Sequence, residues 1–135
     1  MTKQFINVAS GYWKVFIYYV PDEDGLIEIS EMLSQLNCPS KDVEQIIDNL
    51  KCCRNTGSTY TNTEEKCSVV CINKTTNEGQ FINTVVHELT HVAVHICNYY
   101  NTPLDGEQFA YLIGYLVYNV HKIILDIIER EEYIN

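Results

Sequence analysis

Residues 81–100 read FINTVVHELTHVAVHICNYY, and this stretch decides the fold. Its apolar residues recur every three to four positions, which is the spacing of one face of an amphipathic helix. We therefore predict a helix that runs from the end of the polar loop 74–80 to about Tyr100, with its histidines on the face opposite the apolar stripe. That stripe consists of Phe81, Val85, Leu89, Val92 and Ile96.

The chain before this helix alternates between strand and helix patterns. Residues 11–20, GYWKVFIYYV, are aromatic and β-branched and end at a proline, which favours a strand. Residues 26–36 and 40–50 carry apolar positions at helical spacing and predict two short helices. The stretch 59–73 surrounds the polar turn 62–65 and predicts a β-hairpin. Three strands and two helices are therefore expected ahead of the histidine-bearing helix.

The C-terminal third predicts one long helix. Residues 101–103, Asn-Thr-Pro, end the preceding helix, and Asp105 with Gln108 makes a start similar to a capping box. Apolar periodicity then persists to Ile128, and we expect the charged tail 129–135 to fray. The order of elements predicts a small α+β domain in which a short antiparallel or mixed sheet packs on the histidine-bearing helix and this last helix.

Composition limits the number of domains and the kinds of partner. A chain of 135 residues with 46% apolar and 20% charged residues fits a single domain over 1–135. Eighteen acidic and nine basic residues give a formal charge of -9, which argues against nucleic acid or an anionic membrane as partner. No apolar run approaches the length of a membrane span and the start lacks a signal-peptide pattern, so we expect a cytoplasmic protein.

The six cysteines are expected to be reduced. Without an export signal, disulfides are not the preferred interpretation. Cys67 and Cys71 fall on one face of the predicted strand, where small buried thiols pack well, and neither they nor Cys52 and Cys53 have the spacing of a zinc knuckle.

His87, Glu88 and His91 form an HExxH motif within the predicted helix. Residues four apart are neighbours on a helix, so both imidazoles can approach one zinc ion with nitrogens about 2.0–2.1 Å from it. Glu88 then lies beside the open position of the metal, where it can act as general base on a water. The motif predicts hydrolysis of a peptide or amide bond, although a polar helix face that carries two histidines by chance stays an alternative.

Two histidines do not complete a catalytic zinc site, and Glu107 is the leading third ligand. It lies sixteen residues past His91, in the first turn of the next helix, although a carboxylate there also suits the helix dipole. His95 is two turns, about 12 Å, from His87 on one helix, so we expect it outside the ligand set. His121 is too far along the last helix to join it.

Tyr111 is a candidate catalytic residue because it lies one turn after Glu107 on the same helix face. Its phenol could donate a hydrogen bond to an oxyanion that forms during hydrolysis. A tyrosine that serves packing alone is the alternative, since the chain has ten tyrosines.

The HExxH motif followed by Glu107 resembles the gluzincin group of zincin metallopeptidases. More broadly, Trp13 and the stretches 57–61 (GSTYT), 83–88 (NTVVHE) and 106–112 (GEQFAYL) are similar to small uncharacterised metallopeptidase-type proteins of bacteriophages and prophages. The resemblance implies a minimal zincin core, with a few strands, an active-site helix and a glutamate helix. It also implies zinc as cofactor, and the cytoplasm of a bacterial host if the gene belongs to a phage.

The first functional hypothesis is a zinc-dependent peptidase or amidase whose extended peptide substrate adds to an edge strand near Cys67–Ile72. A second is a phage structural or host-interaction protein that keeps a zincin fold with structural metal or none. A third is an accessory subunit whose cleft is completed by a protein partner or a second copy, with Tyr99 and Tyr100 at the interface.

Overall fold

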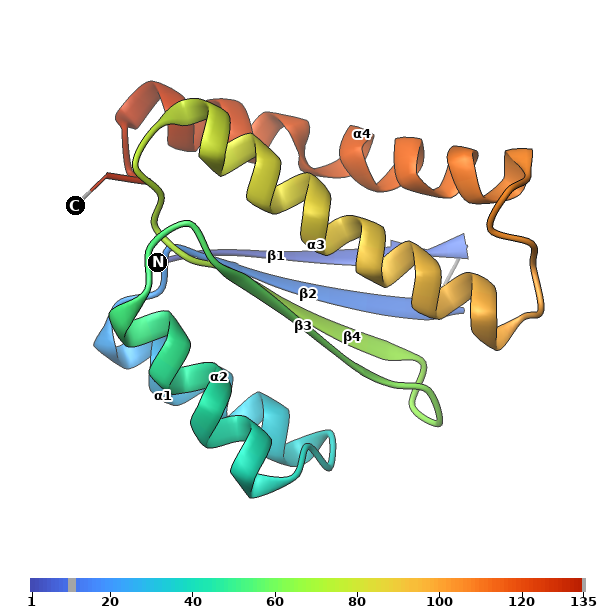
Figure 1. The fold of residues 1–135 in the computed structure, drawn as a ribbon, viewed down its shortest axis with the longest axis horizontal. Helices are drawn as coiled ribbons and strands as arrows, with labels where there is room; N and C mark the ends of the chain where they lie inside the picture. The colour runs from blue at the N-terminus through green and yellow to red at the C-terminus, as the bar shows by residue number, and fades with distance from the viewer. Residues whose placement is uncertain (10–11, 135) are drawn as a thin grey trace.

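The histidine-bearing helix packs across one face of a sheet (Figure 1). A computed structural model describes residues 1–9 and 12–134 of the chain. The elements in these residues are β1 (Thr2–Val8), β2 (Trp13–Tyr19), α1 (Glu23–Gln35), α2 (Ser40–Cys52), β3 (Gly57–Asn62), β4 (Cys67–Ile72), α3 (Glu78–Tyr99) and α4 (Glu107–Arg130).

The sheet has the strand order β1-β2-β4-β3. β1 pairs antiparallel with β2, and β3 pairs antiparallel with β4, as two hairpins. β2 and β4 are parallel, and α1 and α2 lie in the connection between the two hairpins. The predicted small α+β domain is therefore confirmed, and its sheet is mixed.

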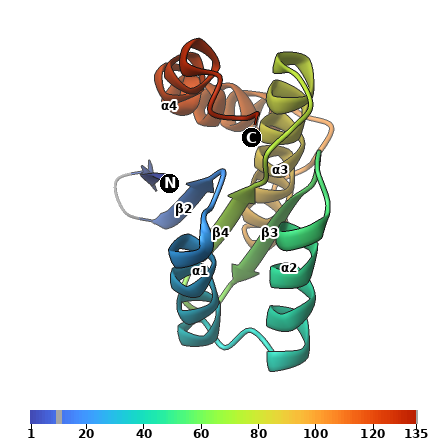
Figure 2. The same cartoon turned by 90° about the vertical axis from the view of Figure 1, so that its left-hand side faces the viewer.

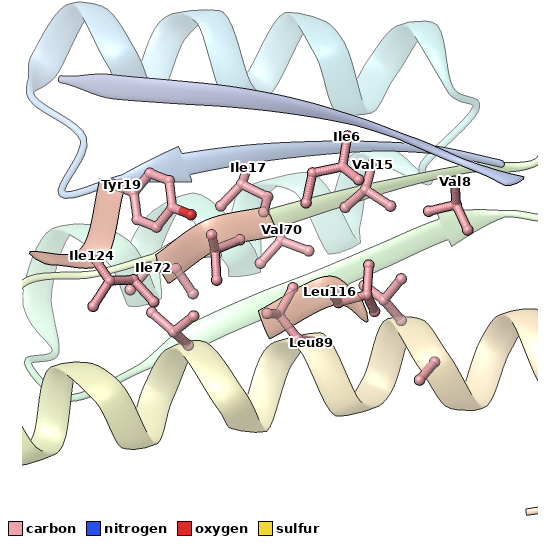
Figure 3. Close-up of a cluster of buried hydrophobic side chains, with 14 of the residues drawn as sticks. Ile6, Val8, Val15, Ile17, Tyr19, Val70, Ile72, Leu89, Leu116 and Ile124 are labelled. Carbon is pink, nitrogen blue, oxygen red and sulfur yellow. The ribbon is translucent and has the colours of Figure 1, made fainter. Parts of the chain in front are cut away.

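Helices cover both faces of this sheet (Figure 2). β4 is buried along its whole length, and its side chains alternate between the two faces with the period of two that a strand imposes. Val69 and Cys71 pack with α1 and α2, whereas Val70 and Ile72 face α3 and α4. Figure 3 shows the core between the sheet and the two long helices, α3 and α4, to which strand residues such as Ile17 contribute.

The sequence missed one strand and misplaced the edge of the sheet. β1 was not predicted, because Lys3, Gln4 and Asn7 interrupt the few apolar residues of this segment. The predicted hairpin is confirmed as β3 and β4, but β4 lies between β2 and β3. The strand at Cys67–Ile72 is therefore interior, and β3 is the edge beside α3.

The C-terminal helix begins and ends differently from the prediction. Gly106 is its N-cap and makes no side-chain cap, so the expected capping box at Asp105 is wrong. Beyond Arg130 the chain is anchored, because Tyr133 is buried against Phe81 with ring centroids 5.8 Å apart. The expected frayed tail 129–135 is therefore anchored at Tyr133, whereas Glu131, Glu132 and Ile134 are exposed, and residue 135 lies outside the described residues.

All six cysteines are free. Cys67 and Cys71 are buried on β4, and burial together with the charge of Glu88 raises the pKa of the Cys71 thiol to about 12. Cys52 and Cys53 lie at the end of α2 with their Sγ atoms 3.1 Å apart. Cys67 and Cys71 thus act as core thiols, as their position on a strand predicted.

Candidate metal site

His87 and His91 project from α3 as a close pair. The His87 side chain is 63% exposed, and its Nε2 atom lies 3.2 Å from Nε2 of His91. Two nitrogens bound to one zinc ion at about 2.0–2.1 Å in tetrahedral directions are about 3.3 Å apart. The two imidazoles are therefore spaced as ligands of a single ion, although one neutral ring could also donate a hydrogen bond to the other.

Glu88 lies beneath the pair and is buried against β3. Its Oε1 accepts a hydrogen bond of 2.8 Å from the hydroxyl of Thr59, while Oε2 lies 3.9 Å from Nε2 of His87. Position 88 falls on the sheet-facing side of α3, whereas positions 87 and 91 fall toward solvent. One carboxylate oxygen is thus held by the strand and the other is turned toward the histidines.

Gly57 is a site residue that sequence reasoning did not identify by its role. A Cβ atom there would lie 2.7 Å from Cγ and 2.9 Å from Oε2 of Glu88, and 3.0 Å from the carbonyl oxygen of Cys71. Only glycine leaves room for the carboxylate between β3 and α3. The available signal was a glycine two residues before the predicted hairpin 59–73, because a glycine next to a strand often marks close approach of another group.

His95 connects the histidine face to the core. Its Nδ1 atom is 2.7 Å from the hydroxyl of Thr61, which is 2.7 Å from the hydroxyl of Ser68. The indole of Trp13 donates a 3.0 Å hydrogen bond to that Ser68 oxygen. Desolvation, and secondarily the nearby His91, lower the pKa of His95. His95 is therefore held to β3 through Thr61.

An open hollow of about 520 Å³ lies next to His95, between β3 and the end of α3. The side chains that line it are Thr59, Tyr60, Thr61, Thr63, His95, Asn98 and Tyr99. Tyr99 also packs edge-on against Trp13, with ring centroids 5.6 Å apart, and Tyr100 packs against the same indole. Tyr99 and Tyr100, which the sequence analysis suggested as an interface, thus each pack locally against Trp13.

The structure does not bring Glu107 or Tyr111 to the histidines. α4 reaches α3 from the side of β1, whereas the contacts of Glu88 and His95 place the histidine face on the side of β3 (Figure 2). Glu107 and Tyr111 are one turn apart as predicted, but both are exposed on α4, opposite the face that packs in the core.

The ligand set of His87, His91 and Glu107 is consequently not assembled in this arrangement. Within residues 1–9 and 12–134, no three His, Cys, Asp or Glu side chains lie together as a group that could hold a metal ion. His121 is exposed on α4, where its Nδ1 lies 2.6 Å from the carbonyl oxygen of Tyr118. His87 and His91 are thus paired, and no third ligand lies beside them among the described residues.

Comparisons with protein-family models, curated proteins and solved structures found no match to this chain. The resemblance to gluzincins therefore stays a prediction that rests on the HExxH motif and the residues around it.

Proposed function

We propose that the protein is a zinc-dependent peptidase or amidase that acts at His87, Glu88 and His91. The observation that carries this proposal is the 3.2 Å separation of the two Nε2 atoms, which suits two ligands of one tetrahedral ion. The position of the buried Glu88 carboxylate beneath the same pair adds the base that hydrolysis needs.

Zinc held by such a pair would supply Lewis-acid polarisation of the scissile carbonyl group and of water. Glu88 would use Oε2, the oxygen that Thr59 does not hold, to accept a proton as water adds to the carbonyl carbon. The same carboxyl group would return the proton to the nitrogen as the carbon–nitrogen bond breaks. Thr59 would keep the carboxylate in one orientation throughout, which lowers the cost of reaching the reactive geometry.

The substrate we propose is an extended peptide or protein segment that adds to β3. This strand is the sheet edge on the histidine side of α3, and its outer hydrogen-bonding groups have no partner strand in the described residues. An added strand would place its backbone next to Glu88, since Thr59 and Gly57 of β3 both contact that side chain. The expected edge strand is thus β3, instead of the interior strand near Cys67–Ile72.

The zinc assignment is tested by metal content. Protein purified without chelator should hold close to one zinc per chain, and replacement of both His87 and His91 by Ala should abolish this. His121→Ala is the matched control, because His121 is an exposed histidine on a different helix. Retention of stoichiometric zinc by the double variant would overturn the proposal.

A second candidate function has one observation in its favour. Because the described residues provide only two paired ligands, the chain could be a structural or host-interaction protein with structural metal or none. A peptidase should cleave members of a diverse peptide library and lose this on Glu88→Gln, whereas a binding protein should capture peptides without cleaving them. The library screen with both proteins therefore separates the two functions.

A further inference from the structure

The outer face of α4 carries large exposed apolar side chains. Tyr111, Tyr115, Tyr118 and Leu125 are 73%, 42%, 72% and 59% exposed. Together with Lys122 they follow one another at intervals of four, three, four and three residues, which is the a/d spacing of a coiled coil. We refer to these five residues as the tyrosine stripe.

The tyrosine stripe is distinct from the face by which α4 joins the core. Leu116, Val120, Ile124 and Ile127 are buried on the opposite side of the helix. No other element lies beyond α4 in Figures 1 and 2, so the stripe faces solvent. By length and composition, α4 is apolar enough to resemble a membrane-spanning helix. Only 22% of its most apolar 18-residue window is buried in the fold. A helix with two apolar faces has a second surface to pack.

We infer that α4 pairs with α4 of a second copy of this chain in antiparallel orientation. In antiparallel a/d packing, Tyr115 of one copy faces Tyr118 of the other, and Lys122 faces Tyr111. The ammonium group then lies against a tyrosine ring, with the carboxylate of Glu107 one helical turn away. In this orientation the cation of Lys122 is thus matched by the tyrosine ring and by the carboxylate of Glu107.

The same stripe disfavours the parallel orientation. Parallel pairing would place Lys122 of one copy against Lys122 of the other, and it would align the two helix dipoles. Gly114, beside the stripe, offers open space around its Cβ position, where a tyrosine of the other copy can enter. Antiparallel pairing is therefore the arrangement that the side chains select.

The association should be weak and should strengthen with salt. Each copy carries a formal charge of -9, and added salt screens the repulsion between two such chains. A contact through a single helix face is also small, and complexes that bury less than roughly 1,200 Å² are usually weak or transient. The pairing leaves the histidine side of α3 free, because α4 lies on the other side of that helix, so it does not depend on the proposed peptidase function.

Sedimentation equilibrium of the full chain, from low to high micromolar concentration, tests the inference. We expect a monomer–dimer equilibrium that shifts toward dimer at higher salt. Tyr118→Ser should weaken the dimer by about tenfold or more, because it truncates an aromatic side chain at the centre of the interface. Ile27→Ser is the matched control, since Ile27 is an exposed apolar residue of α1, and it should leave the dimer unchanged. A chain that stays monomeric at all concentrations, or an equal effect of both substitutions, would overturn the inference.

Charge exchange tests the orientation. Lys122→Glu should weaken the dimer, and Glu107→Lys in the same chain should restore it, because antiparallel pairing brings these positions of two copies together. Failure of the second change to restore association would rule out the antiparallel register. Sedimentation with phosphatidylcholine vesicles distinguishes a membrane surface as the occupant: binding to vesicles that Tyr118→Ser removes, without a dimer, would also contradict the inference.

Discussion

Two helix faces of this molecule expose residues that the sequence singled out, and they differ in what lies beneath them. On α3, His87 and His91 are exposed, but Glu88 between them is held by Thr59 of β3. On α4, Glu107 and Tyr111 are exposed with no described hydrogen bond to another element. The difference teaches that correct spacing on a helix makes a site only where a second element supports it.

The largest expected effect concerns the supported carboxylate. Glu88→Gln should lower peptide hydrolysis by about 10²–10⁴-fold, because the amide cannot accept a proton from water. Glu107→Gln should change the rate little, since that side chain lies on the outer face of α4. Rates on one cleaved peptide, measured with both variants at equal zinc content, give the comparison. Equal losses for the two variants would show that α4 contributes to the site.

Zinc affinity sharpens the same contrast. His87→Ala should weaken zinc by more than the about 10–100-fold that loss of an outer group costs, because it removes a direct ligand. Glu107→Ala should stay within a few-fold of the unmodified chain, as no described contact links it to the pair. Competition with a chelator measures both. A severe loss with Glu107→Ala would restore it as third ligand and require the first turn of α4 to lie elsewhere.

Close packing beneath the motif predicts a stability effect. Gly57→Ala should destabilise the fold by about 1–3 kcal/mol, because the new methyl group meets the Glu88 side chain and a backbone carbonyl. Gly79→Ala in the first turn of α3 should be neutral or slightly stabilising, since its only near neighbour, Asn77 Oδ1, is 3.4 Å away. Urea unfolding of both variants tests this, and equal midpoints would show that β3 and α3 do not approach as closely.

A stability effect of the same size is expected from the hydrogen bond to the carboxylate. Thr59→Val keeps the shape of the side chain but leaves Oε1 of the buried Glu88 without its donor, which should cost about 1–3 kcal/mol of stability. Thr63→Val changes an exposed threonine past the end of the same strand and should be nearly neutral. If thermal unfolding finds the two variants alike, β3 does not hold Glu88.

Much of the fold could be predicted from local patterns. The helical period placed α3 and α4 to within a few residues, and the polar turn 62–65 located the hairpin of β3 and β4. β1 escaped because an edge strand with alternate residues in solvent carries few apolar positions. The order of the strands could not be predicted either. Every residue of β4 is buried, and the apolar pattern of such a strand does not indicate which strands are its neighbours.

The sequence by itself determined the pairing of His87 with His91, because residues four apart on a helix are neighbours regardless of the rest of the fold. Only the tertiary structure decided the surroundings of that pair. Sheet order put β3 beside α3 and brought Thr59 and Gly57 to Glu88, positions about thirty residues apart in the chain. The packing of α4 likewise decided that Glu107 and Tyr111 lie on the outer face of this helix. A helix with two apolar faces can bury either one, and in α4 the opposite face packs in the core.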